Sequence, residues 1–164
     1  MKDLLKNNIP KKYQDNFFLF LFGLTKIPMI FFVGPSIVNF DKSQCVIKIP
    51  LNRRTKNHLN SMYFGALSTG ADIAGGLVAM REISKSKKKV SLSFKDFHAE
   101  FLKRAEGDVH FICNQVEEIK EFVSKVISSK ERMNFPLEVT AIVPKNNNEV
   151  VANFTLTLSL KLKD

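Results

Sequence analysis

Asp72 is the residue whose type and surroundings most strongly suggest chemistry. It is the only aspartate, glutamate, lysine or arginine between Lys56 and Arg81, and its neighbours are mostly alanine and glycine. A carboxylate in such apolar surroundings costs free energy unless it is paired, solvated or functional. Ser68 or Thr69, one turn earlier, is a candidate partner, and a solvated helix face is a second explanation. The functional explanation is a carboxylate that activates water or attacks an electrophile directly.

The chain that leads into the predicted helix of Asp72 is a second candidate for chemistry. Asn57 lies just before this helix, and Asn60 and Ser61 are the candidates for its N-cap. The amides that follow, near Phe64 and Gly65, are expected to point outward and to carry partial positive charge. Such amides can hold an oxyanion or the carbonyl of a thioester. Because every helix has such an end, this feature alone does not define a site.

The element that positions Asp72 is a predicted helix over about residues 61–81. It contains Gly65, Gly70, Gly75 and Gly76, although a glycine inside a helix costs up to about 1 kcal/mol relative to alanine. Close approach of the surrounding chain explains such glycines, so we expect a central helix wrapped by a sheet. Their spacing fits neither the phosphate-binding loop nor the dinucleotide-binding fingerprint.

Alternation of apolar and polar residues predicts five strands. They lie at about 45–51, 90–102, 108–113, 137–143 and 154–162. The asparagines of residues 145–148 predict a hairpin turn between the last two strands. Helical spacing predicts two further helices, at about 13–24 and about 115–129. The prediction is one α+β domain over 1–164, with residues 1–34 as a helical extension packed on it.

Residues 17–38 form a strongly apolar segment. Lys26 and Pro28 interrupt it, so its charge-free stretches are shorter than the roughly 20 residues that a membrane span needs. Asp3 and Asp15 precede it, which is not typical of a signal peptide. We expect a helix, then a break, then a short extended piece. The segment either packs on its own domain or touches a membrane surface, without stable insertion.

The charge of the chain is unevenly distributed. The formal net charge is +9, and the stretch from Lys42 to Lys89 contains ten basic and two acidic residues. Such a stretch attracts nucleic acid, anionic lipid or a phosphorylated small molecule, or it serves only to keep the surface solvated. No nucleic-acid-binding motif accompanies it, so we expect no nucleic-acid partner.

The cysteines and histidines limit other classes of site. Cys45 and Cys113 lie in apolar runs, which predicts buried thiols in a reduced compartment and a cytoplasmic protein. His58, His98 and His110 lack the spacing of metal ligands. We therefore expect neither a metal nor a cofactor.

A glycine- and alanine-rich helix followed by antiparallel strands resembles the hotdog fold, in which a sheet wraps around a long central helix. The segment NHLNSMYFGALSTGADIAGG, at 57–76, resembles the central motif of acyl-CoA thioesterases of the phenylacetate-pathway type. An uncharacterised branch of the same superfamily, defined by a domain of unknown function, is closer still. The stretches that resemble members of this branch are FGLTKIPMIFFVGP, IPLNRRTKNHLNSMYFGA and FKDFHAEFLKRAEGDVHF. Together with the central motif, this resemblance covers most of the chain.

This resemblance implies roles for individual residues. Asp72 matches the catalytic carboxylate of the family, and Asn57 matches the asparagine that places water or substrate. Gly65 matches the second glycine of the turn at the helix start. Phe64 stands where that family has the oxyanion glycine, and Tyr63 stands where it has a histidine. The sites of the superfamily form across a subunit interface, which implies a homodimer or a dimer of dimers.

The resemblance also implies coenzyme A as part of a small-molecule acyl thioester substrate. Candidate contacts to it are Arg53, Arg54, Lys56, His58, Tyr63, Thr69, Lys103 and Arg104. The phenylalanines of 17–32 either line an acyl tunnel or belong to the core. Two functions remain open: an acyl-CoA thioesterase, and a non-catalytic acyl-CoA or fatty-acyl binder on the same fold.

Overall fold

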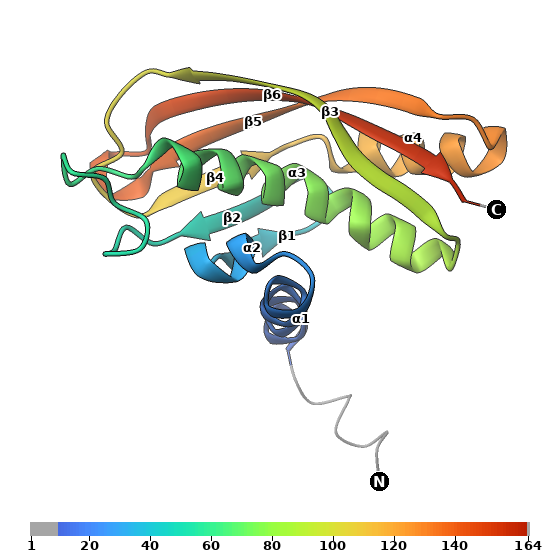
Figure 1. Cartoon of the computed structure of the whole chain (residues 1–164), viewed down its shortest axis with the longest axis horizontal. Coiled ribbons are helices and arrows are strands. Elements are labelled where there is room, and N and C mark those ends of the chain that lie inside the picture. Colours follow the sequence, from blue (N-terminus) through green and yellow to red (C-terminus); the bar gives the residue numbers. More distant parts are fainter. Residues whose placement is uncertain (1–9, 164) are drawn as a thin grey trace, which may run out of the picture.

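The computed structural model describes residues 10–163, apart from the side chains of Lys11 and Lys12, and it has the predicted α+β architecture (Figure 1). Within this range one antiparallel sheet of six strands has the order β1-β2-β4-β5-β6-β3. It curves over the long helix α3 (Phe64–Ser86). The strands are β1 (Ser36–Phe40), β2 (Cys45–Ile49), β3 (Val90–Phe101), β4 (Val109–Cys113), β5 (Met133–Val143) and β6 (Glu149–Leu162).

The glycines of α3 lie where the sheet comes close to the helix, which confirms the prediction of a wrapped helix. A Cβ atom at Gly70 would lie 2.3 Å from the ring of Phe111 on β4. A Cβ at Gly75 would lie 2.6 Å from Leu137 on β5. Both of these side chains are fully buried. The glycines therefore allow helix and sheet to pack at a distance that alanine would prevent.

The boundaries of α3 differ from the prediction at both ends. Its N-cap is Tyr63, with no side-chain hydrogen bond, and neither Asn60 nor Ser61 caps it. Asn60 has a left-handed conformation, with φ of 60°, and the Ser61 hydroxyl donates to the Asn57 side chain instead. At the other end the helix continues to Ser86, five residues beyond the predicted end, because no glycine or proline stops it earlier.

The N-terminal segment forms two helices, α1 (Lys11–Thr25) and α2 (Pro28–Val33). The predicted break is present, but the short extended piece after it is wrong. Pro28 occupies the first turn of α2, where its missing N–H needs no partner, and Gly34 in the left-handed region ends the helix. In Figure 1 both helices lie on the side of α3 that faces away from β6. Residues 1–9 of the predicted extension lie outside the described residues.

A pair of hydrogen bonds connects α1 to the sheet. The Ile37 N–H donates to Asn16 Oδ1 at 2.7 Å, and Asn16 Nδ2 donates to the Ile37 carbonyl at 3.3 Å. The Asn16 amide thus pairs with the β1 backbone as a neighbouring strand would. Strand β1 was missing from the five predicted strands, because it is short and its burial does not alternate.

The remaining elements largely confirm the prediction. Strand β5 begins four residues earlier than expected, and the predicted helix at about 115–129 is α4 (Val116–Ser129), which buries one apolar face. In the turn before β6, Asn147 and Asn148 both have positive φ. Within residues 10–163 no helix is both long enough and apolar enough to span a membrane.

Cys45 and Cys113 are buried, unpaired thiols, as predicted. They lie opposite each other in the register of β2 and β4. Burial raises the pKa of both thiols.

Candidate active site

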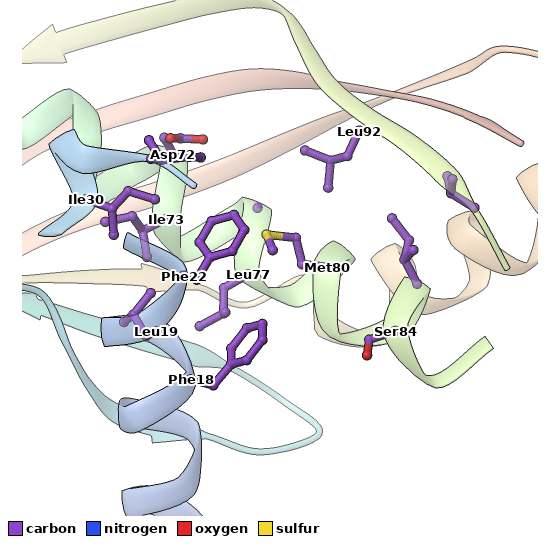
Figure 2. Close-up of a pocket in the computed structure, with 14 residues that line it drawn as sticks. Phe18, Leu19, Phe22, Ile30, Asp72, Ile73, Leu77, Met80, Ser84 and Leu92 are labelled. Carbon is purple, nitrogen blue, oxygen red and sulfur yellow. The ribbon is translucent and has the colours of Figure 1, made fainter. Parts of the chain in front are cut away.

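A cavity of about 380 Å³ lies between α3, the two N-terminal helices and the beginning of β3. Figure 2 shows Asp72 at one end of this cavity and Ser84 at the other, with Phe18 and Phe22 of α1 between them. Almost all of the other lining side chains are apolar: Leu19, Ile27, Ile30, Ile73, Leu77, Met80, Ile83, Val90 and Leu92. Among the described residues of the lining, the Asp72 carboxylate is the only ionisable group.

The Asp72 carboxylate is half-buried, and no hydrogen bond or ion pair to it is found in the described part of the chain. The two hydroxyls considered as its partners are used elsewhere. Ser68 Oγ donates to the Phe64 carbonyl at 3.0 Å, and Thr69 Oγ1 donates to the Gly65 carbonyl at 2.8 Å. Burial without a compensating partner raises the pKa of Asp72 above its ordinary value of 3.8. A carboxylate of raised pKa is a stronger base toward water.

The cavity follows one face of α3. Residues 72, 73, 76, 77, 80, 83 and 84 line it, and they recur at the three- and four-residue spacing of a helix face. Asp72 stands out in the sequence, whereas Met80 and the β3 residue Leu92 do not. The helical spacing from Asp72 is the signal that identifies Met80, whereas Leu92 is brought to the cavity only by the tertiary structure.

A second cavity, of about 580 Å³, lies at the start of α3. Six of the predicted site residues line it together: Asn57, His58, Tyr63, Phe64, Lys103 and Arg104. The structure thus brings the loop before the helix and the chain after β3 to one place, although they are about 45 residues apart in sequence. The Lys103 ammonium forms an ion pair with Glu149 on β6.

The first amides of α3 are placed as expected for a helix N-terminus. The N–H groups of Ala66 and Leu67 both donate to the Tyr63 carbonyl. Within residues 10–163 the N–H groups of Phe64 and Gly65 have no backbone acceptor. They are therefore donors that a ligand oxygen can use. The Phe64 ring beside them is 58% exposed and packs 4.7 Å from the Tyr63 ring, measured between centroids.

Asn57 organises the loop in front of this helix. Its Oδ1 accepts from the Leu59 N–H at 2.9 Å, from the Ser61 N–H at 3.2 Å and from the Ser61 hydroxyl at 3.3 Å. The oxygen is thus fully used by the loop. Its Nδ2 makes no hydrogen bond to a described group. A ligand oxygen is therefore the kind of partner that this amide nitrogen could take.

The remaining predicted contacts lie outside both cavities. Lys56 Nζ donates to Asn60 Oδ1 at 3.3 Å, and Arg54 lies 6.0 Å from the centroid of the Phe32 ring. Arg53 is exposed, whereas the Thr69 hydroxyl and Gly65 belong to the first turns of α3. The structure therefore gathers half of the twelve predicted residues at one cavity and places Asp72 at another.

The distance between these two places follows from the helix itself. Phe64 and Asp72 are eight residues apart on α3, which corresponds to about 12 Å along its axis. A carbonyl oxygen held by the Phe64 amide is therefore too far from the Asp72 of the same chain for a water molecule to bridge them.

The fold is that of several solved thioesterase structures. A candidate thioesterase of Shewanella oneidensis superposes with a TM-score of 0.74 at 13% identity, over 92% of this chain and 99% of the other. A Chlorobaculum tepidum protein of unknown function superposes with a TM-score of 0.78 at 17% identity, over 93% of this chain and 97% of the other. A Haemophilus influenzae thioesterase superposes with a TM-score of 0.60 at 14% identity, over 87% of this chain and 88% of the other. At these identities the similarity establishes the fold alone, which is the hotdog fold.

The family follows from the sequence. Residues 17–160 match the family model of a domain of unknown function, DUF4442, and the chain belongs to this family. A search among curated proteins finds no match to the sequence.

Proposed function

We propose that this protein is a thioesterase that hydrolyses an acyl thioester, with Asp72 as the base that activates water. The observation that supports this most directly is the unpaired, half-buried carboxylate at one end of an apolar cavity. In the proposed reaction, Asp72 takes a proton from water while the water oxygen attacks the thioester carbon. The carbon–sulfur bond then breaks, and Asp72 returns the proton to the leaving thiolate.

The acyl chain occupies the cavity beyond Asp72 in this proposal. The lining runs from residue 72 to residue 84 of α3, about 18 Å along the helix axis. Beyond Asp72, and apart from Ser84 at the far end, the described wall residues offer no polar group that would select a substituted chain. Such a wall fits an unbranched or aromatic hydrocarbon chain, which it holds by removing apolar surface from water.

Two copies of the chain complete the site. Because Asp72 lies about 12 Å from the amides of its own helix start, we infer that it acts on a thioester whose carbonyl is held by the Phe64 and Gly65 amides of a second copy. The edge strand β3 has a free side, since within the described sheet it pairs only with β6. A homodimer formed at this edge, or a dimer of such dimers, is the proposed assembly.

Coenzyme A is the proposed carrier of the acyl group. His58, Lys103 and Arg104 line the cavity at the helix start, where the phosphates would lie, whereas Arg53, Arg54 and Lys56 lie on the preceding loop, outside this cavity. The Asn57 Nδ2 donor and the early amides of α3 would orient the thioester. We also propose that the protein is related to the thioesterases of the phenylacetate-pathway type and that it acts in the cytoplasm.

Thiol release from a panel of short, long and aromatic acyl-CoAs tests the proposal. We expect hydrolysis by the native protein and at least about a hundredfold loss in the Asp72→Asn variant. Because Asn has nearly the same shape as Asp, the variant is expected to fold as the native protein does, and circular dichroism verifies this. Single turnover in ¹⁸O-labelled water tests for the nucleophilic role: label in the Asp72 carboxylate requires an acyl–aspartyl anhydride that water opens at the aspartyl carbon, and a base mechanism cannot produce it.

A non-catalytic acyl-CoA binder is the second candidate. The observation that favours it is the exposed Phe64 ring, which stands beside the amides that would hold the thioester oxygen. A binder would protect the thioester from cleavage, so tight binding of an acyl-CoA without thiol release would identify this function.

A further inference from the structure

The outer surface of α1 and α2 is the most apolar exposed region among the described residues. In the described part of the chain seventeen large hydrophobic side chains are exposed, and ten of them belong to these two helices and their connection. They are Tyr13, Phe17, Phe18, Phe20, Leu21, Leu24, Ile27, Met29, Phe31 and Phe32, of which Phe18 and Ile27 also line the Asp72 cavity. We call this set the apolar platform. Monomeric proteins rarely leave so much contiguous apolar surface in water unless it contacts something.

Helix α1 is apolar on both its inner and its outer face. Leu19 and Gly23 are buried against the rest of the fold, and Phe22 is half-buried. The opposite face bears Phe17 and Phe20, which are 63% and 51% exposed. From residue 17 to residue 25 the helix has no charged side chain. A helix that is apolar all round is adapted to burial on more than one side, and the described fold covers only one.

The charges around the platform are cationic. Lys26 is exposed at the connection between the two helices, and Arg54 is exposed beside α2, over the Phe32 ring. Arg53 is exposed next to it in sequence. Between residues 13 and 34 the only acidic side chain is Asp15, which is half-buried. The platform thus combines exposed aromatic groups with positive charge at its border.

We propose that the apolar platform docks on the surface of an anionic phospholipid bilayer. The aromatic and aliphatic side chains enter the boundary between headgroups and acyl chains, while Lys26, Arg53 and Arg54 contact the phosphates. The helices lie in the plane of the interface and do not span the bilayer. A second copy is a poorer occupant, because a symmetric contact would set each cationic border against itself.

The cluster near the helix start is a separate surface. Leu59, Tyr63, Phe64, Phe97, Phe101 and Leu102 are the other exposed hydrophobic side chains apart from Val150. They belong to the loop before α3, the helix start, and β3 with the chain that follows it. The dimer proposed above uses that surface, so it leaves the platform available for lipid. Docking does not require catalysis, and the Asp72→Asn protein is expected to dock as the native protein does.

Tryptophan reporters test the docking directly, because the chain contains no tryptophan. The Phe17→Trp variant places a single indole on the platform, and the Val150→Trp variant places one at an exposed side chain of β6 that belongs neither to the platform nor to the proposed dimer surface. Each protein is titrated with vesicles of phosphatidylcholine alone and with vesicles containing phosphatidylglycerol. We expect a blue shift of emission only for Phe17→Trp with anionic vesicles, weakened by added salt.

Further substitutions in the Phe17→Trp protein measure the two contributions. Phe20→Gln/Leu24→Gln is expected to lower partitioning at least about tenfold, since each side chain loses apolar burial. Lys26→Gln is expected to lower partitioning about fivefold on anionic vesicles at low salt, and by less at high salt. The substitution Val150→Gln, on β6, is the matched control and is expected to have no effect.

Three results would overturn the proposal. One is the absence of a blue shift with anionic vesicles at low salt. Another is an equal shift at both reporter positions, which would indicate non-specific adsorption. The third is a blue shift of Phe17→Trp that depends on protein concentration and not on vesicles, which would identify the platform as a contact between copies.

Discussion

The most informative prediction is that two inactive variants restore activity when they share a dimer. The first variant is Asp72→Asn, which removes the proposed base. The second is Phe64→Pro, which removes the N–H of the first helical residue. Proline suits this position, because it is the first residue of α3 and because Tyr63, before it, has φ of −65° and ψ of 138°. The helix is therefore expected to form without that one donor.

The expected recovery follows from the geometry of α3. If each site combines Asp72 of one copy with the Phe64 amide of the other, a hybrid dimer has one site with both groups intact and one with neither. Random exchange makes half of the dimers hybrid, so the mixture regains about a quarter of the native activity. Each variant alone is expected to lose a factor of about 100 to 1,000, the usual effect of deleting one oxyanion donor or the base.

The assay is thiol release after co-expression of the two variants with different affinity tags, which allows the hybrid to be purified. Phe64→Ala is the matched control for the ring, because it keeps the N–H and is expected to retain most of the activity. A folded, purified hybrid with no more activity than its parents would refute the reasoning. It would mean that Asp72 and the Phe64 amide do not serve opposite copies of one site.

Three further predictions concern stability and the thiols. Asp72→Asn is expected to raise the free energy of unfolding at pH 7 by about 0.5–2 kcal/mol. The raised pKa of Asp72 means that the native state loses stability as pH increases above 3.8, so denaturant titrations of the two proteins should converge below that pH; a less stable variant at pH 7 would indicate a structural carboxylate. Gly70→Ala is expected to cost about 1–3 kcal/mol, because its Cβ would meet the buried Phe111 ring at 2.3 Å; unchanged thermal unfolding would contradict this packing. Cys45→Ala/Cys113→Ala is expected to keep its activity, and the native thiols are expected to react with a disulfide reagent only after unfolding; rapid reaction of the native protein would show that they are accessible.

The central helix could be predicted because its sequence is unusual in a physically specific way. Glycine inside a helix is unfavourable, so its repetition indicated close packing, and Gly70 and Gly75 meet Phe111 and Leu137 as expected. Asp72 stood out for the same reason, since its type conflicts with its surroundings. Strong alternation likewise identified β6 and the paired strand β5.

The N-terminal part and the helix start were harder to predict because their residue types permit several structures. Pro28 is compatible with an extended segment and with the first turn of a helix, and only the packed structure distinguishes them. Asn60 and Ser61 have the side chains of N-caps, but Asn57 accepts from Ser61 and the helix begins later. Asp72 and the residues of the helix start belong to one sequence motif. Only the tertiary structure shows that Asp72 and the cavity at the helix start lie apart.

Helices α1 and α2 form one wall of the Asp72 cavity, and the two hydrogen bonds between the Asn16 amide and the Ile37 backbone connect this wall to strand β1. Few side chains of α1 and α2 are buried: in the described part of these helices they are Leu19, Ile30 and Val33. We therefore expect that breaking the Asn16 contact lets this wall open by local unfolding while the sheet stays intact. Amide exchange at Ile37 reports the free energy of that opening. A ligand that binds the cavity more tightly when the wall is closed slows this exchange. The free energy of opening increases by the difference in binding free energy between the closed and the open wall, so the affinity can be measured without any turnover.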